Sequence, residues 1–250
     1  MSFGRDHYNP SRGAKSSGFI VIYVRKAGKD HMDGSVNRPL RTIAAALEKL
    51  PVSSNVGIVI DIGPGTWQED ITVPPVRFFG NRKFSRAISS RLGLGGSDSD
   101  YLGLLIRGTT GNFSEVGFRA EKNRFAPKVV FESDGNSKDV FFSPATKITG
   151  TITSQPSSCF ELSCLEINTG KSDYSYCLCT YGSMATIKGV ILKSNFSPIS
   201  FESFSDVRLE GCYVKAKQQI KLRNKSILKL KDCVGVDQIE NTDDSIVIKI

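Results

Sequence analysis

At 250 residues, the chain is long enough to bury a substantial core within one large domain, and no apolar run is long enough to cross a bilayer. Its net charge of +8 favours anionic partners such as nucleic acid, an acidic polysaccharide or an acidic protein surface. With 23 Gly, 10 Pro and 15 Phe, the composition indicates a β-rich protein with many turns.

The first 18 residues are polar and lack the apolar core of a secretory signal. We expect residues 1–18 to form a flexible arm and residues 19–250 to form a single domain. Synthesis in the cytoplasm without a signal peptide and no membrane insertion are expected. The six cysteines all lie in the second half, where most occupy apolar repeat positions, so reduced thiols packed as small core residues are predicted.

The best helical pattern in the chain covers residues 38–51, with the sequence RPLRTIAAALEKLP. Pro39 suits a first helical turn, and apolar side chains follow Leu40 at i+3, i+4 and i+7. Pro51 would end the helix. The pattern predicts an α-helix over 38–51 with one apolar face.

The second half of the chain repeats itself every 18 to 25 residues. In the clearest copy, three residues recur 21 positions later, so that Val207, Leu209 and Cys212 match Leu228, Leu230 and Cys233. Extending this alignment gives one apolar column, made of Leu162, Ile187, Leu209, Leu230 and Ile248. A second column contains Cys177, Ile199, Ile220 and Ile239. Two columns that drift together indicate a stacked repeat.

Within each repeat, apolar and polar residues alternate, which predicts short strands with one buried face. Coils of this length with two or three strands favour an all-β, single-stranded parallel β-helix. We expect regular coils over 159–250, irregular coils or insertions over 80–150, and the 38–51 helix as an N-terminal cap. The apolar final strand at 246–250 predicts a covering subunit, and hence a homo-oligomer, a trimer being one option.

Residues 23–74 resemble the opening of pectin-lyase-like right-handed β-helix proteins. The resemblance rests on the strand, the Gly/Asp loop, the Thr-Ile helix and the motif GPGTWQE at 63–69. It implies a right-handed solenoid related to polysaccharide-acting enzymes. The catalytic patterns of these enzymes, which combine aspartates with calcium, arginine, glutamine or histidine, find no residue-by-residue match. The resemblance is therefore closest in character to non-catalytic viral and phage tail-spike or appendage proteins.

Two groups of residues are candidate ligand-binding sites. The outward neighbours of the first column form a predicted basic ladder, which consists of Lys188, Arg208, Lys229, Lys231 and Lys249. Glu210 is the one acid within it. Three further lysines just after these strands were expected to extend it, namely Lys193, Lys215 and Lys217. Tyr174 and Tyr176 flank another strand and could stack against sugar rings or fill a subunit contact. No catalytic residue, metal ligand or cofactor is predicted.

Three functions fit these features, and charges that serve only solubility are a fourth explanation. The favoured hypothesis is a non-catalytic attachment protein, associated with a virion if viral, that binds a glycan or another anionic ligand. The alternative is a polysaccharide lyase or hydrolase using Glu202, Asp206 or Glu210. A nucleic-acid-binding module ranks lower, because the basic ladder lacks interleaved aromatic residues.

Overall fold

The protein is described by a computed structural model covering residues 19–78, 103–109, 144–169, 176–236, 239–241 and 244–250. The predicted arm over residues 1–18 and most of the predicted irregular region over 80–150 lie outside these residues. No helix among the described residues is both long and apolar enough to span a membrane.

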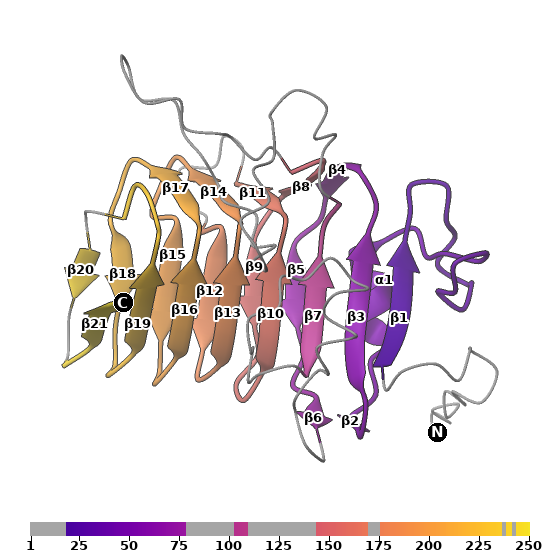
Figure 1. Ribbon diagram of the computed structural model, residues 1–250, viewed down its shortest axis with the longest axis horizontal. Helices are drawn as coiled ribbons and strands as arrows, with labels where there is room; N and C mark the ends of the chain where they lie inside the picture. Colours follow the sequence, from indigo (N-terminus) through magenta and orange to yellow (C-terminus); the bar gives the residue numbers. More distant parts are fainter. Residues whose placement is uncertain (1–18, 79–102, 110–143, 170–175, 237–238, 242–243) are drawn as a thin grey trace, which may run out of the picture.

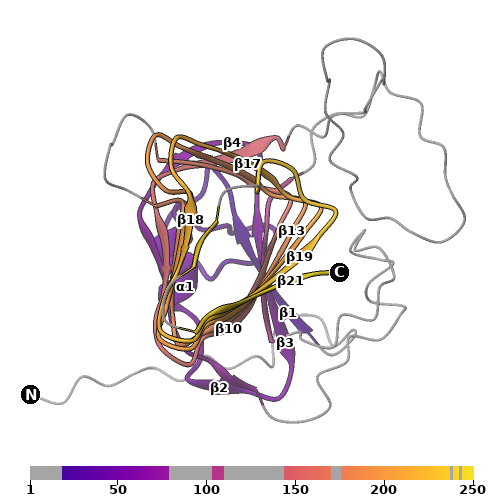
Figure 2. The same ribbon diagram turned by 90° about the vertical axis from the view of Figure 1, so that its left-hand side faces the viewer.

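Three parallel sheets form the walls of an elongated coil (Figures 1 and 2). The first sheet has the order β1 (Phe19–Val24), β3 (Gly57–Ile62), β7 (Leu104–Arg107), β10 (Cys159–Ser163), β13 (Met184–Lys188), β16 (Asp206–Glu210), β19 (Ile227–Lys231) and β21 (Ile246–Lys249). The second has β17 (Tyr213–Ala216), β14 (Ile191–Ser194), β11 (Glu166–Asn168), β8 (Thr146–Thr149) and β4 (Gly65–Gln68). The third has β20 (Ile239–Asn241), β18 (Ile220–Leu222), β15 (Ile199–Glu202), β12 (Leu178–Tyr181), β9 (Ile152–Ser154) and β5 (Ile71–Val73). A short pair, β2 (Ser53–Ser54) and β6 (Arg77–Phe78), completes the set.

Consecutive strands of the chain enter consecutive sheets, and each strand pairs in parallel with its equivalent one coil away. The fold is therefore a right-handed parallel β-helix, which confirms the class predicted from the repeats. The pairs Val207 with Leu228 and Leu209 with Leu230 are in register, as the 21-residue spacing predicted. All four side chains are buried in the core, and burial of each stabilises the fold by about 1.5–3 kcal/mol.

The last coil is offset by one residue from the predicted register. Val247, and not Ile246 or Ile248, stacks on an inward leucine, Leu228. Ile246 and Ile248 therefore face outward and are 52% and 41% exposed. A slip of one residue moves every side chain to the other face of a strand, so the prediction was wrong about both isoleucines. The oligomer inferred from this apolar strand stays a prediction.

In the third sheet, the predicted column was wrong at one coil. Leu178 pairs with Ile199, so Leu178 lies in the inward column that was assigned to Cys177. The remaining members follow the prediction, since Ile220 pairs with Ile239. None of the six cysteines forms a disulfide, and Cys177 and Cys212 belong to the hydrophobic core.

The N-terminal helix, α1 (Ile43–Glu48), is much shorter than the predicted 38–51. The preceding residues are held instead as an extended segment, because the Leu40 N–H and C=O exchange hydrogen bonds with the end of β1. Thr42 is the N-cap and accepts a hydrogen bond from the Ala45 N–H. The helix lies at the N-terminal end of the coil and packs Ile43 and its neighbours against β1 and β5.

Candidate functional site

The outer face of the first sheet carries most of the predicted cationic residues. Lys188 lies at the end of β13, Arg208 on β16, and Lys229 and Lys231 on β19, each at a position that alternates with the buried column. Lys249 differs, because the shifted register pairs it with inward-facing Leu230 and not with Lys231. The prediction that Lys249 continues the ladder was therefore wrong. The ligand-binding role of these residues stays a prediction.

The four cations form ion pairs with three acids, where the sequence predicted one. Lys188 Nζ lies 3.3 Å from Glu161 Oε2, and Lys229 Nζ lies 2.8 Å from Asp206 Oδ2. Glu210 is shared, at 3.5 Å from both Arg208 Nη2 and Lys231 Nζ. The pairs at Asp206 and Glu210 are partly exposed and contribute about 1 kcal/mol or less each, whereas the Glu161 side chain is only 5% exposed. The face is a mixed-charge network with a surplus of positive charge, and not a uniform basic ladder.

Lys193 and Lys215 do not extend this network. They lie on β14 and β17 of the second sheet, which forms another wall of the coil. Lys193 instead approaches Glu166 on the neighbouring coil at 3.2 Å. The expectation that lysines following the ladder would enlarge it was wrong, because the chain turns into the next sheet immediately after each strand.

Polar atoms without a hydrogen-bond partner concentrate on the same outer face. Of the four buried side-chain atoms of this kind in the described part of the chain, three lie here: Glu161 Oε2, Ser163 Oγ and Arg208 Nε. Lys188 is near Glu161 Oε2 but is not directed at it as a hydrogen bond. Buried polar groups are normally satisfied, so a cluster of exceptions marks a site where function or a ligand accounts for them.

Glu161 is the most unusual of these residues. It projects outward from β10, yet only 4% of it is exposed. Burial raises the pKa of its carboxyl, and the nearby Lys188 ammonium opposes this increase only in part. The alternation of the repeat predicts that Glu161 faces outward, one position before the inward Leu162. Phe160 and Leu162, the apolar residues on either side of Glu161 in the strand, were the only feature of the sequence that pointed to its burial.

We expect Glu161→Gln to change how stability depends on pH. A pKa raised in the folded state means that the folded protein holds the proton more tightly, so stability is full below the unfolded-state value of about 4.3 and falls as pH rises through the raised folded pKa. The glutamine variant mimics the protonated acid and should flatten this fall. Thermal unfolding measured from about pH 4 to neutral pH checks it. Parallel curves for the variant and wild type would contradict the prediction.

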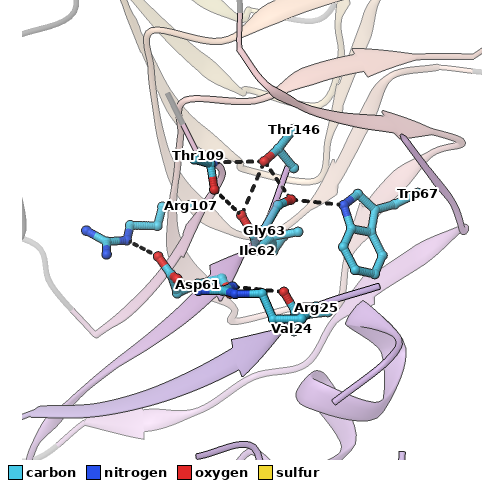
Figure 3. A network of polar contacts seen from close by, with 9 residues as sticks. All are labelled: Val24, Arg25, Asp61, Ile62, Gly63, Trp67, Arg107, Thr109 and Thr146. Carbon is cyan, nitrogen blue, oxygen red and sulfur yellow. Dashed lines mark hydrogen bonds and ion pairs between the residues drawn. The ribbon is translucent and has the colours of Figure 1, made fainter. Parts of the chain in front are cut away.

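At the N-terminal end of the first sheet, a second polar network fixes the first coils together (Figure 3). Asp61 on β3 binds Arg25 Nη2 at 2.5 Å and Arg107 Nε at 2.6 Å. Nearby, the buried Thr146 hydroxyl accepts the Thr109 N–H at 2.8 Å and lies 2.9 Å from the Gly63 carbonyl, to which it can donate. These contacts link residues up to 84 positions apart, and we assign them a structural role.

The other predicted site residues lie on different surfaces. Tyr174 is outside the described residues, whereas Tyr176 packs edge-on against Phe196 with ring centroids 5.4 Å apart. Burial raises the pKa of the Tyr176 hydroxyl. Glu202 ends β15 of the third sheet and accepts a hydrogen bond from Ser200. Asp206 and Glu210 lie on β16 of the first sheet and form ion pairs with its cations. The catalytic use of one of these acids stays a prediction.

Among the described residues, no group of three or more His, Cys, Asp or Glu side chains could hold a metal ion. No family model matches the chain, and no curated protein matches it in sequence. Solved structures do match. The deglycosylated pectin methylesterase from Aspergillus niger aligns with a TM-score of 0.51 at 14% identity, covering 88% of this chain and 57% of that one.

Two further matches are more distant. Pectin methylesterase PemA from Erwinia chrysanthemi has a TM-score of 0.40 at 16% identity, over 85% of this chain and 54% of that one. A rhamnogalacturonan lyase has a TM-score of 0.42 at 9% identity, over 92% of this chain and 62% of that one. The chain thus spans less than two thirds of the length of these structures. The Aspergillus match confirms the pectin-lyase-like fold predicted from residues 23–74, and the viral attachment role stays a prediction.

Proposed function

We propose that the chain binds an acidic polysaccharide along the outer face of the first sheet, from β10 to β19. The observation that carries this proposal is the row of four cations on three successive coils, beside buried polar atoms that form no hydrogen bond. Coils in a parallel sheet are about 4.8 Å apart, so the cations recur along a line that an extended polyanion can follow.

The ion pairs on this face leave room for such a ligand. Arg208 keeps Nε without a partner while Nη2 lies 3.5 Å from Glu210, a long contact. Nε is buried, but the Arg208 side chain is 41% exposed, so a carboxylate of the ligand can approach the outer end of the guanidinium. Lys229 and Lys231 are each about one third exposed and can turn toward the same ligand.

The fold supports a polysaccharide as the ligand class, since the Aspergillus protein that shares it is named as a pectin methylesterase. Nucleic acid is a weaker candidate for this face, because the outward positions of β13, β16 and β19 carry no aromatic side chain for base stacking. A viral attachment protein that binds a glycan would use the same surface, and no feature of this surface favours a viral protein over a non-viral one.

A second candidate function is polysaccharide modification with Glu161 as a proton donor. The raised pKa of this carboxyl favours it, because burial makes the acid hold its proton to a higher pH than an exposed glutamate, and a protonated acid can protonate a leaving group. Glu161 would act beside Lys188, which lies close enough to hold a substrate carboxylate.

Binding is tested by titrating the protein with polygalacturonate in a calorimeter. Replacing Arg208 and Lys229 together by alanine should weaken binding by about tenfold or more, because two charge-assisted contacts are lost. Added salt should weaken the wild-type interaction. The matched control, Lys193→Ala with Lys215→Ala, removes two charges from the second sheet and should bind like wild type. Equal losses in both double variants would overturn the proposed surface.

The same mixtures distinguish binding from modification. An enzyme that cleaves the glycosidic bonds would release reducing ends or unsaturated products from the polymer, and Glu161→Gln would stop this while keeping affinity. Binding without any such product would reject the second candidate and leave the first standing.

A further inference from the structure

An open surface pocket lies at the corner between the third and first sheets, on the last coils. Its volume is about 420 Å³, and more of it faces solvent than is enclosed by protein. It is lined by residues from the turns that follow β15, β18 and β20, namely Ser203, Phe204, Asn224, Lys225 and Asp244. We call this group the turn-stack pocket.

All five lining residues have a left-handed backbone, with φ between 52° and 63°. This conformation costs about 1–2 kcal/mol for Ser203, Phe204 and Lys225, and less for Asn224 and Asp244, because asparagine and aspartate tolerate it. One coil earlier, Gly182 has φ of 51° and its N–H bonds to the Glu202 carbonyl. The same conformation recurs at other turns, as at Cys164 and Asp232, so it belongs to the turns of the coil, and the side chains distinguish the pocket.

These side chains do not recover the cost by packing inside the protein. Phe204 is 71% exposed, which makes it the most exposed large apolar side chain in the described part of the chain. No hydrogen bond or ion pair among the described residues engages the side-chain polar atoms of Asn224, Lys225 or Asp244. The Phe204 N–H bonds to the Asn224 carbonyl at 3.0 Å and keeps adjacent turns aligned.

The chemistry of the lining identifies a ligand class. Phe204 offers an exposed aromatic surface, while the other residues supply a hydroxyl, an amide, an ammonium and a carboxylate. A sugar ring matches this combination, because it has an apolar face and a rim of hydroxyl groups that donate and accept hydrogen bonds. The charges of Lys225 and Asp244 cancel, which favours a neutral sugar over an acidic one.

We propose that the turn-stack pocket binds a neutral pyranose, with its apolar face on Phe204 and its hydroxyls on Asn224, Lys225 and Asp244. The pocket adjoins the start of β16 and β19, and the proposal does not depend on the function proposed for the outer face of the first sheet.

The test uses methyl β-galactopyranoside as the probe and follows the ring signals of Phe204 and the side-chain amide of Asn224 by NMR. Saturable shifts of both signals in the millimolar range are expected. Phe204→Ala, followed through Asn224, should weaken binding by about fivefold to tenfold, and Phe204→Trp should restore it. The control Val234→Ala removes another exposed apolar side chain, 44% exposed, and should bind normally.

Shifts that do not saturate, or equal affinity in Phe204→Ala and wild type, would overturn the proposal. Saturating polygalacturonate separates the two sites. If the pyranoside still binds in its presence, the pocket is independent of the first-sheet face. If the polymer displaces the pyranoside, the pocket is part of the acidic polysaccharide site and the neutral-sugar assignment is wrong.

Discussion

Asp61→Asn is expected to lower the free energy of unfolding by about 2–4 kcal/mol. Asp61 is 8% exposed, and its two carboxylate oxygens bind two different arginines, Arg25 and Arg107, from strands on either side. The amide would leave two guanidinium groups close together with no opposing charge. Arg25 is about one third exposed, so water stabilises its charge in the variant. Loss of the Arg25 pair should therefore account for the smaller part of the destabilisation.

Urea denaturation followed by circular dichroism measures this loss, and Asp33→Asn is the matched control. Asp33 also faces an arginine, Arg38, but at 3.6 Å and with about half of each side chain exposed. Its removal should cost less than about 1 kcal/mol. A similar small loss for Asp61→Asn would show that the network in Figure 3 does not hold the first coils together.

The coil could be predicted from sequence because inward side chains repeat in columns. Leu209 and Leu230 stack as the 21-residue spacing required. The register of the last coil was predicted wrongly because its strand, Ile-Val-Ile-Lys-Ile, offers an apolar residue in either register. The apolar pattern alone could not choose between the two registers.

A better register signal was present in the serines. Each strand of the first sheet from β10 onward is preceded by a buried serine two residues before its first inward apolar residue; these are Ser158, Ser183, Ser205, Ser226 and Ser245. The Ser205 N–H bonds to Ser226 Oγ, and the Ser226 N–H bonds to Ser245 Oγ. Aligning serines instead of isoleucines would have placed Val247 inward and removed Lys249 from the ladder.

The charges of the site were harder to predict than their positions. Asp206 pairs in register with Ile227, yet its carboxylate reaches diagonally to Lys229. Such a contact depends on how far a long side chain reaches to the adjacent coil, and the spacing of the repeat does not predict it. The burial of Glu161 likewise depends on tertiary packing, which spacing along the strand does not report. The helix prediction failed for a related reason, since pairing with β1 outweighed the helical pattern before Thr42.

Gly108→Ala is expected to have the largest effect, a loss of about 4 kcal/mol or more in the free energy of unfolding. Gly108 is buried where the chain leaves β7, and its N–H bonds to the Ser163 carbonyl of the next coil at 2.9 Å. A methyl group there would overlap the Cys164 carbonyl oxygen and lie 2.8 Å from Thr146 Cβ. Cys164 belongs to the next coil and Thr146 to the start of β8 in the same coil, so relief requires the pairing of β7 with β10 to break and the turn into β8 to shift.

Gly182→Ala separates this steric effect from the general cost of replacing a turn glycine. Gly182 has φ of 51°, but a methyl group there meets only the Ser203 carbonyl oxygen, at 3.2 Å. Its replacement should cost about 1–2 kcal/mol, through backbone strain alone. In thermal unfolding, each kcal/mol corresponds to a shift of about 2–4 °C for a chain of this size. Gly108→Ala should therefore unfold well below Gly182→Ala; the reverse order would mean that the coils are not packed as closely as the contacts at Gly108 require.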